Sequence, residues 1–119
     1  MFNYNVEIET ALTGAKIEHG FMHYDGDAST YVVYMQTDKS GVLEGDDSIL
    51  GCVQYYDFDI YSTGNYLSTV STVIETMEGF GWTYQPSRDS PDMYETDTRY
   101  YHKTICMAKE SQRIEESEE

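Results

Sequence analysis

Apolar and polar side chains alternate along the stretch from Ile49 to Ser62, which contains "YYDFDIYS". With a period of two, one face of a strand would carry Tyr56, Phe58 and Ile60, and the other Tyr55, Asp57, Asp59 and Tyr61. The pattern predicts a long strand with one face in the core and one in water. "STYVVYMQT", Ser29 to Thr37, is rich in β-branched and aromatic residues and predicts a strand before it.

Bulky residues occupy both faces of a third long strand, predicted from about Met93 to Ala108. Tyr100, His102, Thr104 and Cys106 alternate there with Arg99, Tyr101, Lys103, Ile105 and Met107. We expect this strand to contact something on each side, so Tyr94, Tyr101 and Ile105 are candidates for a subunit or partner interface. A short strand is predicted within "FGWTYQP".

Two segments have helical periodicity. The first, Asn3 to Thr13, places Tyr4, Ile8, Ala11 and Leu12 on one face. The second lies within "YLSTVSTVIETMEGFG", with Ser62 or Thr63 as the expected N-cap and Gly79 as the expected left-handed C-terminal residue. Its apolar stripe is expected to pack on the sheet, giving a core of Tyr56, Phe58, Ile60, Leu67, Val70, Val73, Ile74 and Met77.

The segment "DKSGVLEGDD", Asp38 to Asp47, combines two glycines with many acids. Such a composition predicts an exposed hairpin or loop that reaches away from the sheet. Val42 and Leu43 would be an unusual apolar tip on an isolated monomer, so they are further interface candidates.

These elements predict an α+β domain. We expect an antiparallel sheet of about four strands, two helices mainly on one face, and an extended hairpin loop. The length predicts one domain over residues 1–109. The acidic segment 110–119 is expected to be a flexible tail, because it cannot bury enough apolar area to offset its ordering entropy.

Charge narrows the functional classes. Seven Lys and Arg residues against 22 Asp and Glu give a formal charge of −15. Nucleic-acid binding normally needs clustered cations, so specific DNA binding is not expected. No apolar run approaches a membrane span and the first residues do not resemble a signal peptide, so we expect assembly in the cytoplasm without membrane contact. Cys52 and Cys106 lie in apolar strand-like runs and are expected to be buried free thiols.

Few residues suggest reaction chemistry. His19 and His23 have helical spacing, but Gly20 interrupts them and no third metal ligand is fixed by spacing. Asp57 and Asp59 share a strand face, where solvated carboxylates are favoured over a cation site or an acid/base pair. The familiar phosphate, dinucleotide and metalloprotease motifs are missing from the sequence. We therefore expect a non-enzymatic protein with no catalytic residues, metal ligands or cofactor.

Nearly the whole chain, from Met1 to about Lys109, resembles the small tail terminator, or tail completion, proteins of long-tailed bacteriophages. The resemblance lies in "TYVVYMQTD", "LEGDDSILG", "YYDFDIYSTGN", "LSTVSTVIETMEGFGW" and "MYETDTRYYHKTICM", taken in that order. The helix departs from the usual one in being rich in Ser and Thr rather than in Lys and Glu.

The resemblance implies a structural virion protein of the tail and neck. Six copies would form a ring that caps the head-proximal end of the tail tube, ends its polymerisation and provides the head-joining surface. The implied partners are the chain itself, the tail tube protein and a connector or stopper, while DNA passes through unbound. Asp57 and Asp59 would then face the channel. The sequence leaves two other functions open: another neck component, such as a connector or stopper, and an acidic DNA mimic that inhibits a DNA-binding protein.

Overall fold

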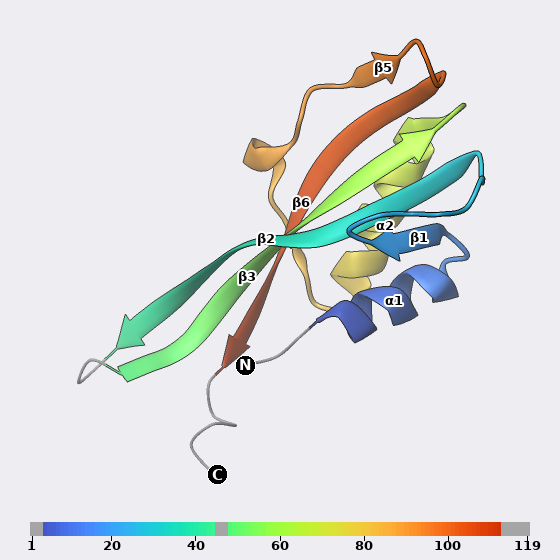
Figure 1. The fold of residues 1–119 in the computed structure, drawn as a ribbon. Helices are drawn as coiled ribbons and strands as arrows, with labels where there is room; N and C mark the ends of the chain where they lie inside the picture. The colour runs from blue at the N-terminus through green and yellow to red at the C-terminus, as the bar shows by residue number, and fades with distance from the viewer. Residues whose placement is uncertain (1–3, 45–47, 113–119) are drawn as a thin grey trace.

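Two helices cover one face of a six-stranded sheet in the computed structural model (Figure 1). The structure describes residues 4–44 and 48–112, with side chains for 4–38 and 51–110. The elements in chain order are α1 (Asn5–Gly14), β1 (Glu18–Phe21), β2 (Thr30–Glu44), β3 (Ser48–Ser62), α2 (Tyr66–Gly79), β4 (Thr83–Tyr84), the 3-10 turn η1 (Pro86–Arg88), β5 (Met93–Glu95) and β6 (Tyr100–Gln112). The α+β class is confirmed.

The sheet is mixed and larger than the sequence predicts. Its order is β1-β2-β3-β6-β4, and β5 also pairs with β6. β1 runs parallel to β2, from Glu18↔Tyr31 to Phe21↔Tyr34, so the expectation of a purely antiparallel sheet is wrong. Gly20 permits the tight return after β1, because a Cβ at that position would lie 2.0 Å from the carbonyl oxygen of His23.

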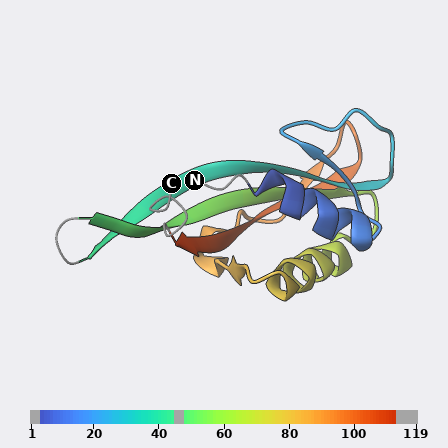
Figure 2. The same ribbon diagram turned by 90° about the horizontal axis from the view of Figure 1, so that it is seen from below.

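α1 agrees with the periodicity of the sequence. Ile8, Ala11 and Leu12 are buried, and Tyr4 packs against the same core. Lys16 ends this segment with a positive φ of 62°, and Ile17 then leads into β1. α1 lies on the same face of the sheet as α2 (Figure 2), and this turn leads the chain from α1 into the edge strand β1.

α2 has different ends from those predicted. The side chain of Asn65 accepts a hydrogen bond from the Ser68 amide at 3.1 Å and caps the helix. Ser62 is instead a buried strand residue whose hydroxyl is bonded to Thr30 Oγ1. At the other end Gly81, with φ +93°, takes the left-handed position expected for Gly79.

The core lies between this helix and the sheet. Tyr56, Phe58, Ile60, Val70, Val73 and Met77 are buried in it, and Ile74 packs against it. Leu67 was expected in the core, but it is 55% exposed. The neighbouring Tyr66 packs against that core and stacks on Tyr101, with ring centroids 5.0 Å apart.

β2 and β3 form one long antiparallel pair that runs past the helices (Figure 1). The register continues to Glu44↔Ser48, with shifts between Gln36 and Asp38 and between Val42 and Leu43. Most of the predicted loop from Asp38 to Asp47 is therefore strand, and its tip at 45–47 lies outside the described residues. β-Bulges accommodate such irregular sequence within a paired strand.

The predicted last strand is two strands. β5 ends at Glu95 and β6 begins at Tyr100, because the chain turns back between them and Arg99 has φ +66°. β6 then continues to Gln112, paired with Gly51. The first three residues of the predicted tail, 110–112, are thus part of the sheet, and 113–119 lie outside the described residues.

Candidate functional site

We call the sheet face opposite the helices the outer face (Figure 2). It carries a cluster of polar and aromatic side chains. The strand alternation and the register place on it Tyr31, Val33 and Met35 from β2, Tyr55, Asp57, Asp59 and Tyr61 from β3, and Tyr100, His102, Thr104 and Cys106 from β6. The division of β3 into two faces therefore follows the sequence pattern. The β3 residues of the outer face are half-buried, however, so this face is less exposed to solvent than predicted.

Four rings stack side by side across this face. Their centroids are 4.4 Å apart for Tyr24 and Tyr31, 4.8 Å for Tyr31 and Tyr61, and 4.2 Å for Tyr61 and His102. Three of them are direct cross-strand neighbours, Tyr31↔Tyr61↔His102, which brings rings on adjacent strands into contact. We call this set the ring ladder.

The ring ladder also fixes the connection between β1 and β2. Tyr24 comes from that connection, and its hydroxyl donates to Glu18 at 3.1 Å. Tyr100 lies edge-on to Tyr31 and donates from its hydroxyl to the carbonyl of Ala28 at 2.8 Å. Burial, followed by the nearby Asp59 carboxylate, raises the pKa of Tyr61 to about 12. The tyrosines therefore act as a packed and neutral surface layer.

Asp59 has close partners within the outer face. Its Oδ1 accepts a hydrogen bond from Thr104 Oγ1 at 2.6 Å and lies 3.9 Å from His102 Nε2. Its side chain is only 20% exposed. Asp59 is thus a positioned carboxylate rather than a freely solvated one.

Asp57 is held in a different way. Burial raises the pKa of its carboxyl, the charge of Asp59 raises it further, and Arg88 opposes the rise. Arg88 extends from η1 over the Tyr55 ring, with 3.9 Å between the guanidinium carbon and the ring centroid. The same guanidinium lies 3.8 Å from Asp38, so it partly covers and neutralises this end of the outer face.

The interface candidates are not brought together on one surface. Tyr94 is 49% exposed, and Tyr101 is half-buried with Tyr66 on one side and Tyr94 on the other. Ile105 is fully buried in the core, so its assignment to an interface is wrong. It pairs with Phe58 and shares the helix-covered face. The side chains of Val42 and Leu43 lie outside the described ones.

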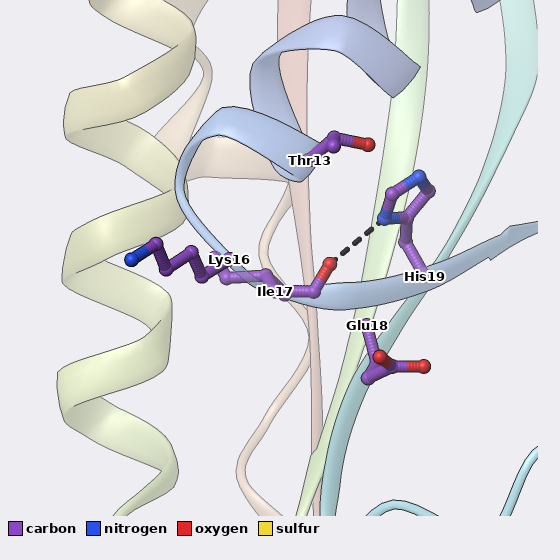
Figure 3. Close-up of a pocket in the computed structure, with 5 residues that line it drawn as sticks. All are labelled: Thr13, Lys16, Ile17, Glu18 and His19. Carbon is purple, nitrogen blue, oxygen red and sulfur yellow. Dashed lines mark hydrogen bonds between the residues drawn. The ribbon is translucent and has the colours of Figure 1, made fainter.

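A shallow pocket of about 300 Å³ lies where α1 leads into β1 (Figure 3). It is lined by Thr13, Lys16, Ile17, Glu18 and His19. His19 Nδ1 is 2.8 Å from the Ile17 carbonyl oxygen, while Lys16 points toward α2 (Figure 3). Such a volume is at the lower limit for a ligand site.

The two histidines considered as metal ligands have separate partners, since His23 Nε2 lies 3.4 Å from Asp25. Within residues 4–44 and 48–112, no group of three His, Cys, Asp or Glu side chains is arranged to hold a metal ion. Cys106 is buried and Cys52 half-buried, both as free thiols.

Sequence reasoning missed the ring ladder and Arg88. The tyrosines were visible in the sequence, but their contacts depend on the register between strands and on the path of the 22–29 connection. Arg88 lies in "SRDSPD", which reads as an ordinary loop until its position beside β6 is known.

In the part of the chain that the structure describes, no helix is both long and apolar enough to cross a membrane. Neither a protein-family model nor a curated protein matches this sequence.

Proposed function

We propose that this protein is a structural assembly protein of a long-tailed phage. In this proposal, copies of the chain form a ring, hexameric by the resemblance of the sequence, that caps the head-proximal end of the tail tube. The ring ends tube polymerisation and provides the surface that joins the head connector or stopper. The protein would be a virion component that acts without a cofactor.

The observation that carries the proposal is the arm, which we define as residues 38–44, 48–55 and 108–112. In the arm β3 lies between β2 and β6, and the register extends from Tyr55↔Ala108 to Gly51↔Gln112. β1 pairs with β2 only as far as Tyr34, and β4 pairs with β6 only at Met107 and Ala108. The described arm therefore has two different sheet edges, β2 on one side and β6 on the other.

Two different edges favour a ring over a dimer. A contact between β2 of one copy and β6 of the next is heterologous, and such a contact closes into a ring when the rotation between copies allows it. Strand pairing of this kind is a common mode of protein association. β2 and β6 each run antiparallel to β3, so they are parallel to each other. Parallel pairing of β2 with β6 of the next copy would leave all copies pointing in one direction.

The outer face would then line the channel. The chain carries 22 acidic and seven basic residues, and Asp57 and Asp59 lie on this face. The carboxylates of Asp57 and Asp59 are partly covered. They would therefore act on the passing DNA as part of the electric field of the whole channel lining. That field reaches about 8 Å at physiological salt, and it repels phosphate. Duplex DNA would pass without being held.

β1 pairs with β2 only as far as Tyr34, so Gln36, two residues before the arm, allows a test of the β2 edge. The carbonyl oxygen of Tyr34 accepts a hydrogen bond from Met22 on the β1 side of β2. Backbone groups of alternate residues point to the same side of a strand, so Gln36 directs its N–H to that side as well. Gln36→Pro removes this donor and obstructs a neighbouring strand, whereas it leaves the bonds to β3 in place.

We expect the wild-type chain, mixed with purified tail tube protein, to form rings at tube ends in electron micrographs and a ring-sized species in native mass spectra. Gln36→Pro should abolish both and keep the folded circular dichroism spectrum. Gln36→Ala is the matched control, because it loses the same hydrogen bond to Gln54 but retains the backbone N–H. Rings formed equally well by all three proteins would show that this edge is not the contact.

The acidic outer face also supports a second candidate, an acidic DNA mimic that binds a basic protein groove. When mixed with tail tube protein, a mimic would remain a monomer or a dimer of this chain. Its binding to a DNA-binding protein would depend strongly on the salt concentration. Virus lacking the chain separates the neck roles. Overlong or headless tubes indicate a terminator, while tails of normal length beside unattached heads indicate a stopper.

A further inference from the structure

His102 lies between two carboxylates that come from different strands. Its Nε2 is 3.9 Å from Asp59 Oδ1 on β3, and its Nδ1 is 3.6 Å from Glu95 Oε2 on β5. The side chain is 16% exposed, and Nε2 is buried with no hydrogen-bond partner. Its ring stacks on Tyr61, which fixes its plane.

The two carboxylates are positioned without help from the imidazole. Asp59 is bonded to Thr104, and Glu95 accepts a hydrogen bond from Thr98 Oγ1 at 3.0 Å. A neutral imidazole carries one N–H and can donate toward only one of them. A protonated imidazole carries two N–H groups and a positive charge, so it can attract both at once.

β5 is a short strand, so an attraction between Glu95 and His102 would help to hold it in the sheet. It meets β6 at only three register positions, Met93↔His102, Tyr94↔Tyr101 and Glu95↔Tyr100. The turn that follows is held by the Arg99 amide, which donates to the Glu95 carbonyl at 2.7 Å. We call residues 93–102 the β5 hairpin.

We propose that His102 is a pH-sensitive latch, which holds β5 against β6 when protonated and loosens β5 when neutral. The titratable groups facing its ring are Asp59 and Tyr61 from β3 and Glu95 from β5, with Tyr100 nearby on β6. The neighbouring Lys103 lies on the opposite face, where it binds Asp92 at 2.8 Å. The latch does not depend on ring formation.

Hydrogen exchange of the β5 hairpin amides tests the latch. Imidazoles gain their proton between about pH 5 and 8, so the wild-type chain is compared at about pH 5.5 and about pH 8 after correction for intrinsic exchange. We expect protection of residues 93–102 to be about threefold to tenfold greater at the lower pH, as for a partly exposed charge pair. His102→Gln should remove this pH difference and leave β2 and β3 protected.

Two further variants keep the test decisive. His19→Gln replaces a histidine bonded to a backbone carbonyl, so it should retain the wild-type difference. Glu95→Gln keeps an acceptor for Thr98 but removes one charge, so it should reduce the difference even if His102→Gln folds poorly. An unchanged pH difference in both His102→Gln and Glu95→Gln would overturn the latch, as would its absence in the wild-type chain.

Discussion

The indole Nε1 of Trp82 donates a hydrogen bond to Oε1 of Glu7 at 2.8 Å, which joins α1 to the segment that follows α2. The same carboxylate oxygen lies 3.1 Å from Lys109 Nζ on β6. Trp82 is 3% exposed and Glu7 bridges three separate parts of the chain. This junction links residues that lie far apart in the sequence and are brought together at the core.

Removing the Glu7 carboxylate should destabilise the protein. Glu7→Ala leaves the buried indole donor without a partner, and we expect the free energy of unfolding to fall by about 1–3 kcal/mol. Glu7→Gln keeps an acceptor and should lose less. Urea unfolding followed by Trp82 fluorescence measures both. Glu9→Ala on the exposed side of α1 is the control, expected within about 0.5 kcal/mol of wild type, and equal losses for the two alanine variants would contradict the role of the junction.

Two large side chains of α2 should differ sharply in their contribution to stability. Met77 is fully buried, so Met77→Ala should lower the free energy of unfolding by about 2–5 kcal/mol. Leu67 is 55% exposed, and Leu67→Ala should change it by no more than about 0.5 kcal/mol. The same denaturant titration compares them. A large loss for Leu67→Ala in the monomer would show that α2 is rotated from the orientation described.

Two glycines at the end of α2 should respond to alanine in opposite directions. Gly81 has φ +93°, and a Cβ there would lie 3.2 Å from Lys109 Nζ, so Gly81→Ala is strained. We expect this substitution to lower the free energy of unfolding by at least about 1 kcal/mol. Gly79 is helical with nothing within 4 Å of a Cβ, so Gly79→Ala should stabilise by about 0.5–1 kcal/mol. Thermal unfolding followed by circular dichroism measures the two shifts, and shifts of the same sign would contradict the assignment.

Two aspartates should contribute to the pH dependence of stability with opposite sign. Burial, with help from Asp59, raises the pKa of Asp57 in the folded protein, so folding loses stability as the pH rises through that raised pKa. Hydrogen bonds from Lys103 and then from Tyr66 lower the pKa of Asp92, so its contribution is present at neutral pH and is lost as the pH falls.

Asparagine substitutions separate these two effects. At pH 7 we expect Asp57→Asn to raise the urea midpoint and Asp92→Asn to lower it. The Asp57 difference should shrink as the pH falls below about 4, the pKa of an aspartate in the unfolded chain. The Asp92 difference should persist to lower pH and shrink only as the pH passes through the lowered pKa of the folded state. A lower midpoint for Asp57→Asn at neutral pH would show that the Arg88 interaction outweighs burial.

The parts of the fold that are periodic in sequence could be predicted from it. The alternation around Phe58 and the helical stripe through Val73 each reflect burial on one face, and the structure buries both residues. β1 could not be predicted, because "EHGF" has no apolar alternation and pairs with β2 only through the return at Gly20. The boundary between β5 and β6 was missed because a chain reversal with Arg99 at positive φ carries no glycine or proline signal.

The outer face was predicted only in part. Alternation placed Asp57 and Asp59 together, but other groups of the outer face come from distant segments: Arg88 from η1, Glu95 from β5 and Tyr24, which stacks on Tyr31. A strand pattern shows which side a residue faces and not what lies above it. The assignment of Ile105 to an interface failed for a related reason. Bulky residues on both faces of β6 indicated a partner outside the chain, whereas α2 and β3 of the same chain supply the contacts on the helix-covered face.

The arm has a consequence for any cyclic assembly built from its edges. The last register pair of β2 and β3, Glu44↔Ser48, lies at one end of the long strand pair, and α1 and α2 lie near the other end (Figure 1). Rotation about a single axis repeats this direction in every copy, so the Glu44 and Ser48 ends of the strand pair would gather on one rim and the helical layers toward the other. The two rims of the ring would therefore differ in chemistry, and the ring could bind a different protein at each end of its axis.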